Sequence, residues 1–219
     1  MAKPLLQVAL DYLEIEAALE TAAAVAEAAD IIEAGTPLLK SVGVRVLREL
    51  KARFPGQLIF ADTKTMDAGA LEASLVFEAG ADLFSLCSAA SRPTLVAGIG
   101  EAHRRGKQAL VDLIGVEDIL EAALRLGELK PDYVCLHLGI DQQEAEGRLP
   151  LEGLDLLRRH LGLPLSVAGG ITRADIPELA RLEPAIIVVG AYITAAQEPA
   201  QAAREVREAM RRAQAGGRP

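Results

Sequence analysis

Short apolar runs alternate with amphipathic stretches along the chain, and the alternation repeats eight times. Nearly continuous apolar composition is typical of strands that are buried on both faces of a parallel sheet. We therefore expect eight strands, at Leu5–Leu10, Ile31–Ala34, Leu58–Ala61, Leu83–Cys87, Ala109–Leu113, Tyr133–Leu136, Leu165–Ala168 and Ala185–Val189.

The stretches between these runs have the spacing of amphipathic helices. After the first run, apolar side chains recur at Ile15, Leu19 and Val25, while Glu16 and Glu20 lie on the opposite face. Glycines that suit a left-handed helix end stand just before later runs, at Gly80, Gly106, Gly127 and Gly162. Each strand is therefore followed by a helix.

Eight strand–helix units in one chain predict an α/β fold of the (β/α)8 TIM-barrel type. We expect a single domain over residues 1–213 and a frayed tail over 214–219. An open doubly wound sheet is the alternative, but it usually has fewer strands and a glycine-rich loop after the first one. Here the first run ends in Asp11-Tyr12, which favours the barrel.

Composition narrows the function. The chain is 51% hydrophobic but only 3% aromatic, so Leu, Ile, Val and Ala must form the core. The net charge is −8 with no block of like charges, and phosphate-binding surfaces need clustered Lys and Arg. Few aromatics are present for base stacking. These features argue against nucleic acid as a partner.

The two cysteines and the N-terminal sequence indicate the cellular compartment in which we expect the protein. Cys87 and Cys135 lie in apolar runs, so we expect buried free thiols in a reducing cytosol, with a disulfide or metal pair as the less favoured alternative. The apolar stretch before Asp11 is too short for a signal peptide or a membrane span. We expect a cytoplasmic protein without membrane contact.

Polar side chains recur where the apolar runs end, which is where TIM barrels place their active sites. A helix cap or an isolated ion pair explains any one of these side chains, but it does not readily explain polar residues at the ends of five strands. The residues are Asp11, Glu33, Asp62, Lys64, Asp112 and His137.

The densest group is the hexapeptide 62–67, for which the alternative is a salt-bridged loop. Alternation along a strand places Asp62 and Lys64 on one face, and Asp67 follows where the chain turns into a helix. Glu33 and Asp62 end adjacent strands and can share Mg²⁺, which takes oxygen ligands and few protein carboxylates. Zinc is less favoured because only one histidine is in place. Alternatively, Glu33 pairs with Lys64 and no metal binds.

Glycines follow the last two runs, at Gly169-Gly170 and Gly190-Ala191. Loops after strands seven and eight often bind phosphate in TIM barrels, through backbone N–H groups and a helix N-terminus. The alternative is tight turns and nothing more.

One of the three histidines is a candidate general base. His137 stands at a strand end, and imidazole titrates near neutral pH. The alternative is a hydrogen-bonded structural histidine. His103 and His160 fall near helix ends and are expected on the surface.

Several segments together resemble the orotidine 5′-phosphate decarboxylase superfamily, and within it the 3-hexulose-6-phosphate synthase family. The resemblance covers nearly the whole chain, and its motif Asp-x-Lys-x-x-Asp is shared across the superfamily. Met66 and the Val-Asp-Leu-Ile run resemble the synthases in particular. The segments are Leu6–Asp11, Glu33–Leu38, Ala61–Gly69, Val111–Asp118 and Ser166–Ile171.

A close branch, the 3-keto-L-gulonate-6-phosphate decarboxylases, shares the motif and the magnesium site. That branch is expected to have Glu where Asp112 stands, and Arg after the last strand's glycine, where this chain has Ala191-Tyr192. Both differences favour the synthase branch. They also imply that backbone amides bind the phosphate, because no arginine stands at this position to hold it.

The resemblance implies a reversible, metal-dependent aldol addition of formaldehyde to D-ribulose 5-phosphate, which gives D-arabino-hex-3-ulose 6-phosphate. It implies a homodimer in which Asp67 reaches the partner's site. The alternatives are the related decarboxylation and a sugar-phosphate-binding barrel without turnover. The implied roles are His137 as the base, Lys64 at the enediolate oxygen, Glu33 and Asp62 for Mg²⁺, Asp11 and Asp112 for substrate hydroxyls, and Gly169, Gly170, Gly190 and Ala191 for phosphate.

Overall fold

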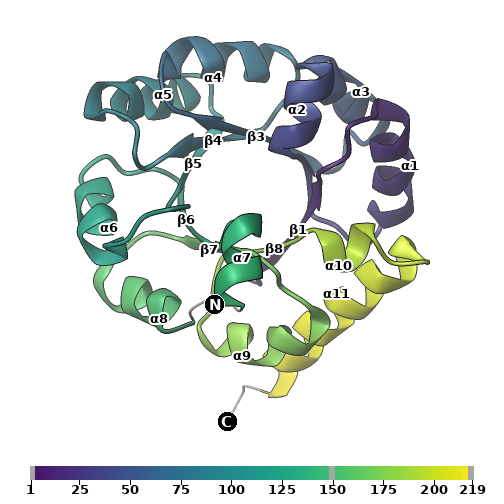
Figure 1. Cartoon of the computed structure of the whole chain (residues 1–219). Coiled ribbons are helices and arrows are strands. Elements are labelled where there is room, and N and C mark those ends of the chain that lie inside the picture. The colour runs from purple at the N-terminus through teal and green to yellow at the C-terminus, as the bar shows by residue number, and fades with distance from the viewer. Residues whose placement is uncertain (1–2, 148–150, 217–219) are drawn as a thin grey trace.

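Eight parallel strands close into a barrel in chain order, with β8 bonded to β1 (Figure 1). The structure is a computed structural model that describes residues 3–147 and 151–216. The expected single-domain (β/α)8 barrel is confirmed, and the doubly wound alternative is wrong. The strands are β1 (Leu5–Leu10), β2 (Ile31–Ala34), β3 (Leu58–Thr65), β4 (Leu83–Cys87), β5 (Gln108–Asp112), β6 (Tyr133–His137), β7 (Leu165–Ala168) and β8 (Ile186–Val189).

Helices surround the barrel (Figure 1), and additional short helices directly follow β2, β6, β7 and β8. The outer ring contains α1 (Ile15–Val25), α3 (Arg45–Arg53), α4 (Gly69–Glu78), α5 (Arg92–Arg104), α6 (Ile119–Gly127), α8 (Leu151–His160), α9 (Ile176–Arg181) and α11 (Pro199–Gly216). The short helices are α2 (Thr36–Val42), α7 (Ile140–Glu146), α10 (Ala191–Thr194) and the 3-10 helix η1 (Arg173–Asp175).

The C-terminal helix is longer than expected. It continues to Gly216 and so includes the first three residues of the expected tail, while residues 217–219 lie outside the described part of the chain. None of the helices in the described ranges combines the length and the apolar character needed to cross a membrane.

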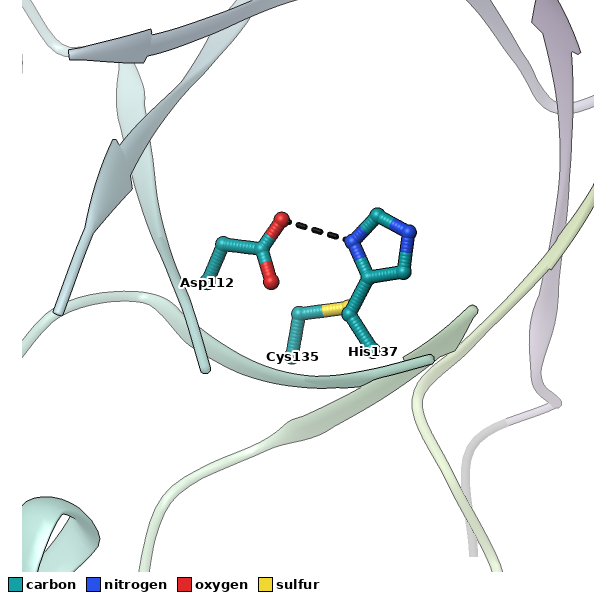
Figure 2. Close-up of side chains that lie close together, drawn as sticks. All are labelled: Asp112, Cys135 and His137. Carbon is teal, nitrogen blue, oxygen red and sulfur yellow. Dashed lines mark hydrogen bonds and ion pairs between the residues drawn. The ribbon is translucent and has the colours of Figure 1, made fainter. Parts of the chain in front are cut away.

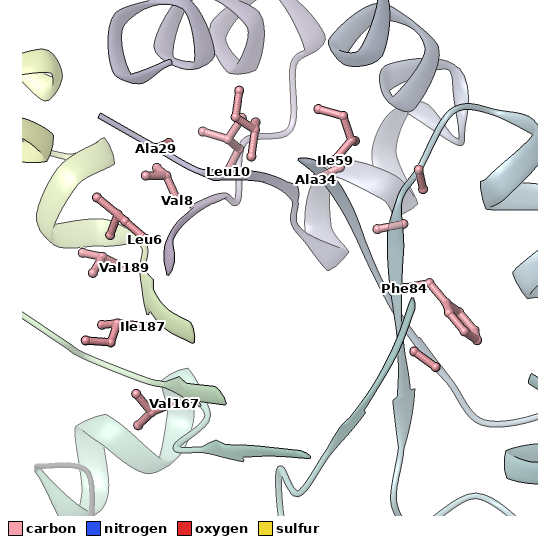
Figure 3. Packing of buried hydrophobic residues seen from close by; sticks show 14 of the residues in the cluster. Leu6, Val8, Leu10, Ala29, Ala34, Ile59, Phe84, Val167, Ile187 and Val189 are labelled. Carbon is pink, nitrogen blue, oxygen red and sulfur yellow. The ribbon is translucent and has the colours of Figure 1, made fainter. Parts of the chain in front are cut away.

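Strand alternation divides the apolar side chains between two cores. On β1, Leu6, Val8 and Leu10 face outward and pack against the helices, together with side chains such as Phe84 (Figure 3). The second core fills the barrel interior. Its buried members are Ala9, Ile31, Phe60, Leu83, Leu110, Cys135, Ala168, Ile186 and Val188.

The N-terminal face of the barrel is fixed by three aspartates that directly precede β2, β4 and β6. Asp30, Asp82 and Asp132 each accept a hydrogen bond from a backbone N–H of the preceding odd-numbered strand, at 2.8 to 3.0 Å. Each also contacts a basic side chain: Arg207, Lys51 with Lys107, and His103, respectively. The opposite face carries the site.

Candidate active site

A cavity of about 730 Å³ opens at the C-terminal ends of the strands. Residues of α2, α7 and α10 contribute to its rim. Asp67 is the one predicted site residue that does not line this cavity. The predicted residues that do line it are Asp11, Glu33, Asp62, Lys64, Asp112, His137, Gly169, Gly170, Gly190 and Ala191.

Asp62 and Lys64 are in contact, but simple strand alternation does not bring them together. The register of β3 shifts after Ala61, and Lys64 adopts a left-handed backbone with φ of 46°. Lys64 Nζ lies 2.5 Å from Asp62 Oδ2. The Ser85 hydroxyl accepts the Lys64 N–H at 2.9 Å and donates to Asp62 Oδ1 at 2.8 Å. A bulge supported by β4 therefore aims the lysine at the aspartate.

This ion pair sets the charge of both groups. Burial opposes ionisation of Asp62, but Lys64 and hydrogen bonds from Ser85 and Thr36 outweigh it and lower the pKa of Asp62. The pKa of Lys64 is raised, because Asp62 and Asp112 outweigh the effect of its burial. Asp62 is therefore a carboxylate and Lys64 an ammonium at neutral pH.

Two further carboxyl groups share this part of the cavity. Glu33 is buried, and burial followed by the charge of Asp62 raises its pKa well above the usual value. The same two causes raise the pKa of Asp11. Lys64 forms ion pairs with Asp62 at 2.5 Å and with Asp112 at 3.8 Å and not with Glu33, so the alternative pairing is wrong. Four carboxyl groups therefore surround one ammonium, and their oxygen atoms fit a hard divalent cation.

His137 and Asp112 form a hydrogen-bonded pair across β5 and β6 (Figure 2). The distance from His137 Nδ1 to Asp112 Oδ2 is 2.8 Å, and Asp112 Oδ1 accepts the Ile114 N–H at 2.9 Å. With Nδ1 donating to Asp112, His137 Nε2 carries the free lone pair. This arrangement suits a general base. The expected contact of Asp112 with substrate hydroxyls stays a prediction.

Cys135 lies beside this pair, and the three ligand atoms of Asp112, Cys135 and His137 are within 4.8 Å of one another. Burial and the charge of Asp112 raise the pKa of the Cys135 thiol well above its usual value. Nδ1 of the imidazole is already engaged by Asp112, and Cys135 is buried in the barrel interior. We therefore interpret the group as a histidine–aspartate pair packed on a thiol. Both cysteines are free, and Cys87 is only partly buried.

The structure explains the presence of glycine differently at the two positions after β7 and β8. Gly169 has φ of 114°, and a Cβ there would lie 2.4 Å from Leu138 O, so the turn itself requires glycine. Gly190 has a negative φ, and a Cβ there would meet nothing closer than 3.8 Å. Packing does not explain Gly190, whose missing side chain leaves backbone open to the cavity.

Asp67 lies outside the cavity of its own barrel. It is exposed, and its Oδ1 accepts the Ala68 N–H at 2.7 Å. Its expected role in a partner's site therefore stays a prediction. His103 and His160 are exposed, as expected.

The sequence interpretation missed several residues that support the site. Gln7 and Ser85 are polar side chains inside apolar strands, and that pattern could have identified them. Gly35 must lack a side chain, because a Cβ there would lie 2.1 Å from Asp11 Oδ1. Thr36 and Lys40 of α2 also line the cavity, but no pattern distinguishes them.

Comparison with known proteins identifies relatives along nearly the whole chain. The chain is 42% identical over 205 residues to the 3-hexulose-6-phosphate synthase of Mycobacterium gastri, which covers 94% of this chain and 99% of that protein. The same protein name is carried by a relative from Bacillus subtilis (strain 168), at 36% identity over 93% of this chain and 97% of the relative.

Solved structures give the same result. A crystal structure of 3-hexulose-6-phosphate synthase matches with a TM-score of 0.90 at 42% identity, covering 94% of this chain and 99% of that one. A 3-keto-L-gulonate-6-phosphate decarboxylase from Vibrio cholerae O1 matches with a TM-score of 0.86 at 29% identity, covering 96% and 99%. The model of the orotidine 5′-phosphate decarboxylase / HUMPS family matches residues 4–206. The chain therefore belongs to the orotidine 5′-phosphate decarboxylase / HUMPS family.

Proposed function

We infer that this chain is a 3-hexulose-6-phosphate synthase, an aldehyde-lyase that joins formaldehyde to D-ribulose 5-phosphate. The product is D-arabino-hex-3-ulose 6-phosphate, and the addition is reversible. Full-length relatives of that name at 36–42% identity support this function. The observation that carries the chemistry is that the His137–Asp112 pair, the Lys64–Asp62 pair and Glu33 line the same cavity.

We propose that Glu33 and Asp62 hold Mg²⁺. Their oxygen donors are buried beside a third carboxyl group, Asp11, and burial followed by the charge of Asp62 raises the pKa of both Glu33 and Asp11. When bound, the ion would supply positive charge next to substrate oxygens and stabilise the enediolate.

The proton chemistry is assigned to two side chains. His137 Nε2 removes a proton from the carbon beside the ketone, and Asp112 stabilises the resulting imidazolium. Lys64 presents its ammonium to the enediolate oxygen. The enediolate carbon then attacks the formaldehyde carbon, and the new alkoxide takes the proton from His137. The reverse reaction uses the same groups in the opposite order.

The remaining side chains would hold the sugar phosphate. Asp11 and Asp112 face the cavity as acceptors for hydroxyl groups, and Gly169, Gly170 and Gly190-Ala191 offer backbone N–H groups to the phosphate. Asp67 is proposed to complete the site of a second subunit, which makes the enzyme a homodimer. The two free cysteines support a reducing, cytoplasmic location.

A second candidate function is decarboxylation of 3-keto-L-gulonate 6-phosphate, which passes through the same kind of enediolate. The similarity to the Vibrio cholerae decarboxylase favours it. Asp112 and Tyr192 differ from the residues expected in that branch, and the relatives with higher identity are synthases. A binding barrel without turnover is disfavoured because a complete acid–base set lines the cavity.

The test is an assay of purified protein with ribulose 5-phosphate and formaldehyde, with Mg²⁺ or with EDTA. We expect formaldehyde uptake only with Mg²⁺, and loss of turnover in Asp62→Ala. Turnover that persists in EDTA or in Asp62→Ala contradicts the mechanism. Release of CO₂ from 3-keto-L-gulonate 6-phosphate as the faster reaction would establish the second candidate instead.

A further inference from the structure

Gln7 is a polar side chain buried in the barrel interior. It stands on β1 between inward-facing Leu5 and Ala9, is only 2% exposed, and contributes to the cavity wall. In the register of the barrel it lies beside Ile31 and Val188. A buried amide is costly unless its hydrogen bonds are made, so an amide among apolar neighbours calls for a specific role.

The nitrogen of this amide is hydrogen-bonded to Glu33. Gln7 Nε2 donates to Glu33 Oε2 at 2.7 Å, and both side chains are buried. Glu33 Oε2 is thereby occupied, which leaves Oε1 as the carboxylate oxygen that is available to a ligand. Among the described residues, this amide is the side chain that hydrogen-bonds Glu33.

The oxygen of the amide has no hydrogen-bond partner among the described residues. Gln7 Oε1 is a buried acceptor without a hydrogen bond to any described residue. A buried polar atom left in this way is unfavourable, because it has lost its hydrogen bonds to water without gaining another. The oxygen therefore marks a place where the site is completed by a donor from outside the chain.

We propose that Gln7 is a positioning residue for the divalent cation of this site. Its Nε2 holds Glu33 in one orientation so that Oε1 of Glu33 is presented to the cation, and its own Oε1 accepts from an ordered water in the cavity. This inference rests on the proposed function, because that function assigns Glu33 to the cation.

The chemistry of the amide fits this role better than that of other side chains. A lysine here would pair with Glu33 and replace the cation, and a second carboxylate would repel Glu33. A neutral amide orients the carboxylate and leaves its negative charge for the metal. Groups that hydrogen-bond metal ligands in this way typically contribute about 10–100-fold to metal affinity or activity.

The test measures metal binding without substrate. Mn²⁺ serves as the probe, and its affinity is measured by electron paramagnetic resonance in the wild type and in Gln7→Met, which keeps the length of the side chain but removes the donor. We expect Mn²⁺ to bind roughly 10–100-fold more weakly to Gln7→Met. We also expect kcat to recover at high Mg²⁺, with KM for ribulose 5-phosphate near the wild-type value.

Ser166→Ala is the matched control. Ser166 is another buried polar residue inside the barrel whose side-chain oxygen lacks a partner, but it does not line the cavity. Its replacement should leave the Mn²⁺ affinity unchanged. Gln7→Leu is the second variant, and thermal melts in EDTA report whether each variant folds.

Wild-type Mn²⁺ affinity in Gln7→Met overturns the proposal, and so does a loss of turnover that high Mg²⁺ does not restore. Failure of both Gln7 variants to fold would make Gln7 a structural residue and overturn it too. Failure of the proposed function looks different, because the wild type would then bind Mn²⁺ but show no formaldehyde uptake. A wild type that binds no Mn²⁺ overturns both.

Discussion

A single hydrogen bond gives His137 its orientation and tautomer, since Nδ1 faces Asp112 Oδ2 at 2.8 Å. The other aspartate oxygen is held by the Ile114 N–H, so the carboxylate cannot turn freely. The sequence places both residues at strand ends, but their contact depends on the register in which Asp112 lies opposite Cys135. No local pattern encodes that register, so the pair could not be predicted.

Asp112→Asn tests this contact. The amide keeps the shape of the carboxylate but can donate to Nδ1, which would move the imidazole proton to Nε2 and remove the base. We expect kcat to fall at least roughly 100-fold, while any rise in KM reports the proposed contact of Asp112 with substrate hydroxyls. Steady-state kinetics measure both. A rise in KM with kcat unchanged would show that Asp112 holds only substrate hydroxyls and does not orient His137. Asp118→Asn, at the exposed start of α6, is the control.

Glu33 is a residue at which function opposes stability. Burial and Asp62 raise its pKa, so the folded protein binds this proton more tightly than the unfolded chain. Its contribution to stability is therefore present below the unfolded pKa and is lost as pH rises through the folded pKa. Above that window, the metal-free protein carries an unfavourable buried charge.

We expect Glu33→Gln to raise the melting temperature of the EDTA-treated protein at pH 8 while abolishing turnover. Each kcal/mol gained corresponds to about 2–4 °C in a chain of this size. Added Mg²⁺ should stabilise the wild type but not the variant. Calorimetry with and without EDTA provides the measurement, and a lower melting temperature for metal-free Glu33→Gln contradicts this account.

At the scale of elements, strand positions followed directly from the apolar runs, because a strand covered on both faces must be apolar. The main error was β3, which continues through Thr65 and not only to Ala61. Its polar C-terminal end faces the cavity, so hydrophobicity alone cannot report it. The bulge that aims Lys64 at Asp62 lies in this extension.

The loops after β7 and β8 make a matched pair of tests. Gly190→Ala should fold, since a Cβ there clears its neighbours, but it should raise KM for ribulose 5-phosphate by crowding the backbone N–H groups. Gly169→Ala should instead destabilise the fold by about 1–3 kcal/mol or more, because of its positive φ and the clash with Leu138. Unfolding curves and KM values separate the two. Unchanged KM in Gly190→Ala contradicts a phosphate site there.

At the scale of the whole molecule, the sequence predicted the closed barrel but could not show which surfaces are left uncovered. Leu71 and Leu75 lie one turn apart on α4 and are 72% and 50% exposed, and Met66 precedes them at 51%. Val96 of the neighbouring α5 is 51% exposed. Such an apolar patch beside Asp67 suits the predicted homodimer.

Leu71→Glu should convert the predicted homodimer to a monomer and lower activity, because a charge would be buried at the proposed interface. Leu124→Glu on α6 is the control, because Leu124 is also an exposed leucine, at 53% against 72% for Leu71. Sedimentation measures the assembly state. Mixing Asp67→Ala with His137→Ala subunits should restore about a quarter of wild-type activity if two-fold dimers share their sites. No recovery on mixing contradicts a shared site.

The aspartates at the N-terminal face have a consequence for how the barrel comes apart. Asp30, Asp82 and Asp132 recur before every second strand, but Ala185 stands at the fourth such position, before β8. There β7 and β8 are joined at two paired positions, against four between β1 and β2 and three each between β3 and β4 and between β5 and β6. The four strand pairs of the barrel, from β1–β2 to β7–β8, are therefore held together unequally. Local unfolding should begin at the β7–β8 pair, the segment that carries both glycine loops.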